Sequence, residues 1–159
     1  MVLKKRLGEI LLESKLITES QLEESLAEAR KLGIKLGRYI TRRGMLSESQ
    51  IIDALSHQLR VNKYHPDSYP VDLNLSGLLP LDLAKKLQVA PLKKSGRLLT
   101  IAMTDPQDIN TLDAIEARTN SEVDPVICTE KELFKIINDL YQASGLEIVM
   151  PDKKPQGKI

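Results

Sequence analysis

The spacing of apolar side chains predicts helices over the first sixty residues and a mixture of strands and helices after them. In two stretches the apolar positions recur every three or four residues, which is the period of a helix with one buried face. These positions are Leu22, Leu26 and Ala29 in the first stretch and Ile51, Ile52, Leu55 and Leu59 in the second. We expect both stripes to face a core.

The first sixty residues contain a repeat with a 29-residue offset. The matched positions are Leu7-Gly8 with Leu36-Gly37, Leu11 with Ile40, and Thr18-x-x-Gln21 with Ser47-x-x-Gln50. The last pair are capping boxes, in which a hydroxyl and an amide satisfy the backbone N–H groups that open a helix. Each copy therefore predicts a short helix, a break and a second helix. Because one helix pair cannot bury its apolar face alone, the two copies should pack as a four-helix unit over residues 1–60.

The chain changes character after this unit. Turn-forming residues dominate positions 61–80, which predicts a linker. Strand-like runs at 89–92 and 98–103 flank a basic turn containing Gly96 and predict a hairpin. A further strand is expected at 123–128, and helices are expected at 81–87, near 109–118 and after the capping box Thr129-x-x-Glu132.

These elements form a small α/β unit over residues 81–145, with a hairpin and two to three helices. The Pro, Lys and Gly content of residues 146–159 predicts a mobile tail. The predicted fold class is therefore α+β, with a four-helix unit of two helix-pair repeats followed by a small α/β unit.

Composition narrows the range of functions. The 159 residues carry 23 basic and 22 acidic side chains, so a net charge of +1 gives no overall attraction to nucleic acid or to an anionic bilayer. The single cysteine excludes an intrachain disulfide and a multi-cysteine metal site. No apolar run approaches the roughly 18 residues of a spanning helix. We expect a cytoplasmic protein that binds neither DNA nor RNA.

Charge is distributed unevenly along the chain. Residues 1–60 carry 11 basic and 8 acidic side chains, a net charge of +3, and the run from Arg30 to Arg43 includes six basic and no acidic ones. This run contains the second Leu-Gly, at a predicted helix start, where free N–H groups and the missing side chain favour an anion. A phosphate-bearing ligand is one hypothesis for the run, and a solvated basic face is the alternative.

Catalytic and metal-binding patterns are absent from the sequence. It contains no phosphate-loop motif, and the two histidines lack the i, i+4 spacing of a helical metal pair. Cys128 has no candidate base, and the acidic residues after position 104 suit turns, caps and a solvated helix face. The residues considered were His57, His65, Cys128, Asp105, Asp108, Asp113 and Glu116. We assign no catalytic residue, no metal and no cofactor, and expect no enzyme activity.

The repeated residues resemble the N-terminal domain of type II secretion and type IV pilus assembly ATPases. Its ligand-binding form, MshEN, has two tandem copies of a motif that together bind cyclic di-GMP. The motif is Arg-Leu-Gly-x-x-Leu-x-x-x-Gly-x-Leu-x-x-x-x-Leu-x-x-Ala-Leu-x-x-Gln. The resemblance covers about residues 5–142. Carried over by position, it implies nucleotide contacts from Arg6, Leu7, Gly8 and Leu11 in the first copy and Lys35, Leu36, Gly37, Ile40, Gly44 and Gln58 in the second.

The resemblance implies a non-catalytic regulatory or adaptor domain that docks a protein partner and couples it to the motor. The implied partners are the ATPase module, in the same chain or another, and a membrane-anchored assembly protein that recruits the domain to the inner membrane face. Lys15, Ala29 and Lys35 replace the motif's Gly, Gln and Arg, which favours this docking function. The alternative is a cyclic di-GMP receptor, which the retained glycines and Gln58 favour.

Overall fold

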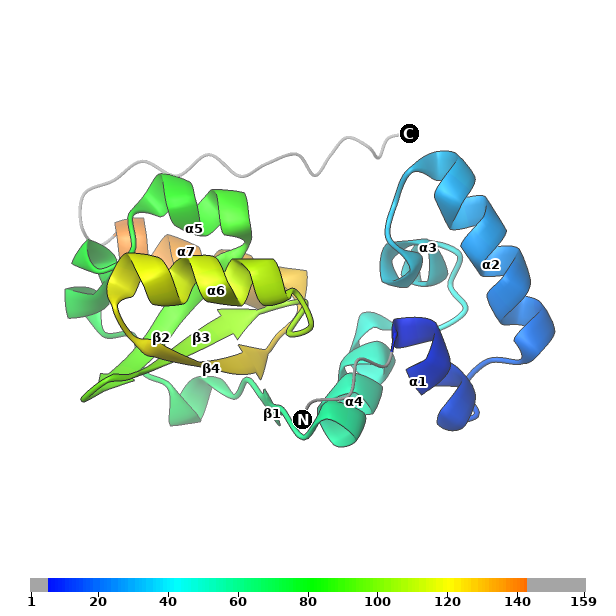
Figure 1. Cartoon of the computed structure of the whole chain (residues 1–159), viewed down its shortest axis with the longest axis horizontal. Helices are drawn as coiled ribbons and strands as arrows, with labels where there is room; N and C mark the ends of the chain where they lie inside the picture. Colours follow the sequence, from blue (N-terminus) through cyan, green and yellow to red (C-terminus); the bar gives the residue numbers. More distant parts are fainter. Residues whose placement is uncertain (1–5, 143–159) are drawn as a thin grey trace. The chain divides into compact units, whose positions relative to one another are not determined.

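The computed structural model describes residues 6–142, and the predicted tail at 146–159 lies outside them. The chain divides into two compact units, one ending at Lys63 and the other beginning at Tyr64 (Figure 1). The fold is α+β, as predicted.

Four helices make up the first unit: α1 (Leu7–Glu13), α2 (Glu19–Leu32), α3 (Leu36–Arg42) and α4 (Glu48–Leu59). Helices α1 and α3 begin at equivalent positions of the two copies, and so do α2 and α4, so the sequence repeat is also a structural repeat. Both predicted capping boxes are present. The hydroxyls of Thr18 and Ser47 each accept the N–H of the glutamine three residues later at 3.1 Å.

The short helices α1 and α3 end in the same turn. Lys15 and Gly44, which are equivalent in the two copies, both have left-handed backbone conformations, with φ of 60° and 74°. The following N–H groups, of Leu16 and Met45, donate to the carbonyls of Leu11 and Ile40 at 3.0 and 3.1 Å. These are the bonds of a Schellman motif, which satisfies the last carbonyls of a helix.

The core stripe predicted on α2 is wrong at one position. Leu26 is 39% exposed, whereas Ser25 and Ala29 are buried. The Ser25 hydroxyl donates to the sulfur of Met45 at 3.6 Å. Because small side chains occupy this face, α2 can approach the second repeat closely and the bulkier leucine remains at the edge. On α4 the predicted positions Ile51, Ile52 and Leu55 are buried, and the predicted position Leu59 is only half-buried.

The second unit is built on a sheet with the strand order β1-β4-β3-β2. Strands β2 (Val89–Ser95) and β3 (Leu98–Met103) form the predicted antiparallel hairpin. Strand β4 (Glu122–Ile127) pairs with β3 in parallel. The two-residue edge strand β1 (Asn62–Lys63) belongs to the last residues before the boundary between the units. A parallel pair needs a crossover connection, and here it contains a helix.

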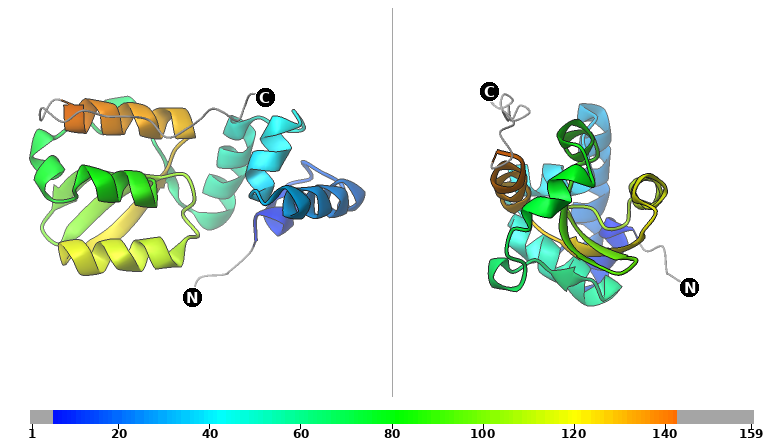
Figure 2. Two further views of the ribbon diagram at one scale, coloured as in Figure 1. Left: turned by 90° about the horizontal axis from the view of Figure 1, so that it is seen from above. Right: turned by 90° about the vertical axis from the view of Figure 1, so that its left-hand side faces the viewer.

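The crossover helix is α6 (Ile109–Thr119), and α5 (Leu81–Leu87) and α7 (Glu130–Gln142) complete the unit. In both views of Figure 2, α5 lies between α6 and α7. The third capping box opens α7, where Thr129 and Glu132 exchange hydrogen bonds of 2.9 and 3.0 Å. Four apolar side chains at helical spacing on α7 are buried: Leu133, Ile136, Ile137 and Leu140.

The segment predicted as a linker, residues 61–80, contributes to the core of the second unit. It forms two short 3₁₀ helices, Pro66–Ser68 and Leu73–Gly77. Leu79 is fully buried, and its carbonyl accepts the hydroxyl of Tyr141 on α7. The segment contains turns, as predicted, but the apolar side chains between them pack against α7 and make the segment part of the second unit.

Candidate functional site

The two copies of the predicted site begin with the same local backbone. Arg6 and Lys35 are the N-cap residues of α1 and α3, with φ, ψ of −79°, 157° and −72°, 152°, and both side chains are exposed. The replacement of arginine by lysine therefore changes the side chain but not the backbone conformation that carries it. What differs is the donor, because an ammonium lacks the planar fork of a guanidinium.

The glycines of the two Leu-Gly elements lie close to leucine side chains. A Cβ on Gly8 would lie 2.8 Å from Leu22 Cδ1, and a Cβ on Gly37 would lie 3.2 Å from Leu7 Cδ2. The second distance places the leucine of the first copy against the glycine of the second. The structure thus brings the two Leu-Gly elements together, although they belong to different copies of the repeat.

The other predicted site residues separate into buried and accessible ones. Leu11 and Ile40 are fully buried, so in this structure they hold the helices together and present no surface to a ligand. Leu36 on α3 and Gln58 on α4 are partly exposed, and Gly44 is exposed. Ala29, which replaces the first copy's Gln, is 4% exposed. The accessible amide is therefore present in the second copy only.

Lys15 does not disturb the turn in which the motif has glycine. Its backbone matches that of Gly44, and its side chain is exposed. The cost of this substitution is conformational, because a residue with a Cβ is strained in the left-handed region. The turn that ends the short helix of the first repeat is therefore retained.

The outward faces of α1 and α3 carry opposite charges, a feature that our sequence reasoning missed. Positions equivalent by the 29-residue offset are Arg6, Glu9 and Glu13 on α1 and Lys35, Arg38 and Arg42 on α3. All six side chains are exposed. The Glu9 carboxylate also accepts the backbone N–H of Arg6 at 3.1 Å, so an acidic group already occupies the start of α1. Alignment of the two copies at every position would have revealed the difference.

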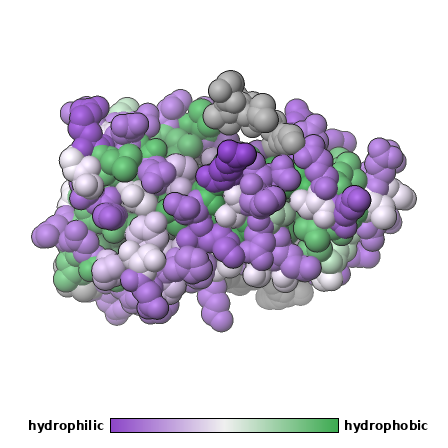
Figure 3. Space-filling model, turned by 90° about the horizontal axis from the view of Figure 1, so that it is seen from below, coloured by the Kyte–Doolittle hydropathy of each residue, from purple (hydrophilic) through white to green (hydrophobic). Residues whose placement is uncertain are grey.

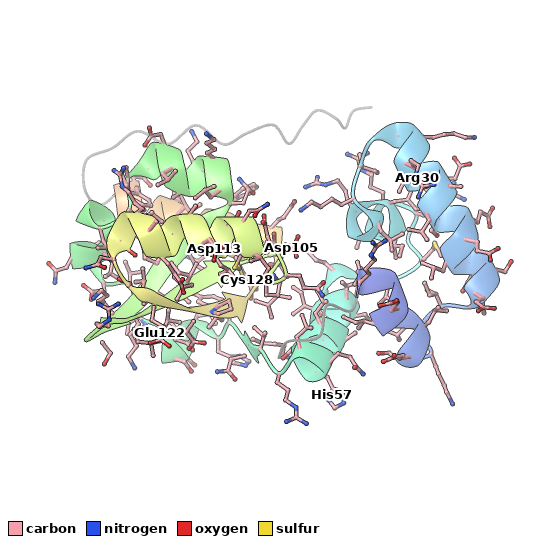
Figure 4. All side chains as sticks on the ribbon, viewed as in Figure 1. Arg30, His57, Asp105, Asp113, Glu122 and Cys128 are labelled. Carbon is pink, nitrogen blue, oxygen red and sulfur yellow. The ribbon has the colours of Figure 1, made fainter. Side chains whose placement is uncertain are left out.

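The other candidate residues have structural roles or exposed positions (Figure 4). Asp108 caps α6 by accepting the Thr111 N–H at 3.2 Å, and Cys128 is 1% exposed. His57 is exposed on α4. Among residues 6–142, no three His, Cys, Asp or Glu side chains group closely enough to hold a metal ion. In the same range, no helix has the length and apolarity needed to cross a bilayer.

Comparison with known proteins identifies relatives of both units. The MshEN domain model matches residues 57–146, which is mainly the second unit. The type IV pilus assembly ATPase PilB of Myxococcus xanthus is 30% identical over 149 residues, which cover 92% of this chain and 26% of PilB. Bacteriophage adsorption protein B of Escherichia coli K12 is 31% identical, over 85% of this chain and 18% of that protein.

A solved structure of MshE with cdg, cyclic di-GMP, is similar to this chain. It is 33% identical, with a TM-score of 0.77, and the match covers 86% of this chain and 99% of that one. The chain spans about a quarter or less of the length of the two curated relatives, so their activities as whole proteins do not transfer to it. The matching family model covers more than half of its residues, and the chain belongs to the MshEN domain family.

Proposed function

We propose that this chain is a non-catalytic regulatory domain whose helical unit binds cyclic di-GMP across its two repeats. The observation that carries the proposal is the match to MshE with cyclic di-GMP, at 33% identity over 99% of that structure. The match spans both units of this chain, including the repeat that holds the candidate site. A non-catalytic role agrees with the lack of any catalytic pattern in the sequence.

The geometry of the repeats supports this proposal. Leu7 packs against Gly37, so the two Leu-Gly elements lie next to each other, with Gly8 buried. The residues Lys15 and Gly44 both have left-handed φ values, so the short helix of each copy ends in the same way. A ligand with two equivalent halves, such as cyclic di-GMP, suits a protein surface made of two equivalent copies.

The charges indicate an unequal division of binding between the copies. The α3 side offers Lys35, Arg38 and Arg42 to a phosphate, whereas the α1 side combines Arg6 with two carboxylates. Arg6 is then the one guanidinium at the motif's arginine position, and a guanidinium fits a guanine edge or a phosphate in a bidentate manner. We infer that Arg6 provides recognition and that the second copy provides most of the charge attraction.

The test is titration calorimetry of the purified chain with cyclic di-GMP, comparing Arg6→Ala with the natural sequence. A charge-assisted hydrogen bond contributes about 1.5–3 kcal/mol, so the variant should bind at least about tenfold more weakly. Arg118→Ala, an exposed arginine on α6, is the matched control and should leave the affinity unchanged. Binding that persists unaltered in Arg6→Ala would show that the site lies elsewhere.

Docking of a protein partner, coupled to a motor, is the second candidate. It is favoured by the buried Ala29, which removes the first copy's amide, and by Lys35, which removes the second copy's guanidinium. Under this alternative the folded chain gives no heat with cyclic di-GMP. The partner would then be sought among the ATPase modules and membrane-anchored proteins of the same apparatus.

A further inference from the structure

The stretch of described residues that is richest in basic side chains comprises the end of α2, the turn after it and α3. We call this segment, residues 30–43, the basic segment. It contains six basic side chains and no acidic one, and all six are exposed: Arg30, Lys31, Lys35, Arg38, Arg42 and Arg43. Figure 4 shows Arg30 on α2 close to the turn that leads to α3. A helix of seven residues is about 10 Å long, so the charges on α3 and the turn are concentrated.

The basic side chains of α3 lie on one side of the helix. Lys35, Arg38 and Arg42 follow a spacing of three and four residues, which places them on one side of a helix. The opposite side of α3 contains Ile40, which is fully buried. The cations therefore point away from the core of the unit. Glu28 pairs with Lys31 at 3.4 Å, but an exposed pair of this kind is weak.

An apolar side chain lies within the same segment. Leu32, the last residue of α2, is 60% exposed, the highest value among the large apolar residues that the structure describes. It precedes the left-handed Gly33 and stands between Lys31 and Lys35 in the sequence. Burying such a side chain would be favourable, and nothing within the described part of the unit covers it.

We propose that the basic segment is a contact surface for an anionic lipid bilayer, with Leu32 entering the interface between headgroups and acyl chains. Clustered Lys and Arg side chains are attracted to anionic headgroups, and an apolar side chain among them adds a hydrophobic contribution. The net charge of the whole chain is only +1, so its electrostatic attraction to an anionic bilayer must come from this segment. The position of the segment therefore determines which face of the unit meets the membrane.

The observations favour a bilayer over an acidic protein partner. A protein interface normally has an apolar centre with an outer polar rim. Here one exposed leucine stands among cations in the sequence. Figure 3 views the molecule from below Figure 1, and on that face apolar residues occur in small groups among polar ones. A fluid, charged interface does not need a fitted surface, so scattered cations and one leucine are sufficient for it.

The test is sedimentation of the full chain with vesicles, without added nucleotide, so that its result is independent of the proposed function. Vesicles of phosphatidylcholine mixed with phosphatidylglycerol are compared with vesicles of phosphatidylcholine alone. We expect binding to the anionic vesicles only, and its loss near 1 M salt, where the Debye length is about 3 Å. Each cation contributes about fivefold, so the double variant R30Q/R42Q should bind about 25-fold more weakly.

Two matched controls separate this surface from a general effect of charge or apolarity. The double variant R97Q/R118Q removes the same charge from exposed positions of the second unit and should leave binding nearly unchanged. Leu32→Ser should weaken binding several-fold, whereas Ile109→Ser, at a residue that is 46% exposed on α6, should not. Circular dichroism checks that every variant is folded.

Three results would overturn the proposal. The first is no binding of the natural chain to anionic vesicles at low salt, which would leave an acidic protein as the occupant of this surface. The second is an equal loss in both double variants, which would show that only net charge matters. The third is unchanged binding in folded Leu32→Ser, which would exclude insertion of the leucine.

Discussion

Lys15→Gly should stabilise the helical unit, whereas Gly44→Ala, at the equivalent position of the other copy, should destabilise it. Both residues have left-handed φ values, 60° and 74°, at the same turn of a Schellman motif. This conformation costs a residue with a Cβ about 1–2 kcal/mol. Glycine avoids that cost but gives the unfolded chain more freedom, which offsets about 0.4–1 kcal/mol. The net change should be about 0.5–1 kcal/mol in each direction.

Steric effects do not complicate the comparison. A Cβ on Gly44 would meet no atom within 4 Å, so the alanine variant tests the backbone conformation alone. Lys15→Ala is the control for the first copy, because it removes the long side chain but keeps the left-handed residue with a Cβ. Its stability should change by less than about 0.5 kcal/mol, as expected for an exposed position.

The assay is urea unfolding followed by circular dichroism, together with hydrogen exchange of the amides of Leu16 and Met45. These amides donate the bonds that close the two turns, so their protection assigns the change to the correct copy. Lys15→Gly should protect the Leu16 amide more strongly, and Gly44→Ala should expose the Met45 amide. A stability change of the same sign in both variants would refute the idea that backbone conformation at these turns controls stability.

Two further predictions concern caps and a buried phenol. Thr18→Ala and Ser47→Ala should each lower the free energy of unfolding in urea by about 1 kcal/mol, because each removes the same type of N-cap hydrogen bond. A much smaller effect of one substitution would show that its repeat does not depend on the cap. Burial raises the pKa of Tyr141 above its usual value near 10, so the unfolded chain loses this proton first as the pH rises. Stability should therefore fall above about pH 10. The variant Tyr141→Phe should not show this pH dependence. Its free energy of unfolding should also be lower by about 1–2 kcal/mol, because the hydrogen bond to the Leu79 carbonyl is removed.

The parts of the fold that the sequence predicts well are those set by local chemistry. A capping box fixes a helix start within four residues, and all three predicted boxes are present. The hairpin follows from two apolar runs around a short turn that contains Gly96, whose φ is 60°. The 29-residue repeat predicts the pairing of helices because the same pattern at the same spacing gives the same structure twice.

The errors occur where tertiary packing decides. Leu26 has the correct spacing for a core position, but the close approach through Ser25 and Ala29 leaves it at the edge. Turn residues in segment 61–80 indicate a linker, yet Leu79 is buried through its contact with α7. Neither outcome can be read from a helical or turn pattern alone, because each depends on which residues from elsewhere in the chain fill the neighbouring space.

The resemblance to the family predicts which residues belong to the candidate site. The structure shows which of these residues are buried and which are exposed. Leu11 and Ile40 belong to the motif but are fully buried, so they contribute through the core. The charge reversal between Glu9 and Arg38 is present in the aligned copies, but its importance depends on both residues lying on exposed, equivalent faces. Only the folded unit shows that.

The measurement that tests the central proposal most directly is calorimetric titration of the folded natural chain with cyclic di-GMP, with GTP and ATP as controls. Our account predicts saturable binding of cyclic di-GMP alone, and weaker binding in Arg6→Ala with Arg118→Ala unchanged. No heat at high nucleotide concentration, from a chain shown by circular dichroism to be folded, would contradict it and leave protein docking as the function of the repeat.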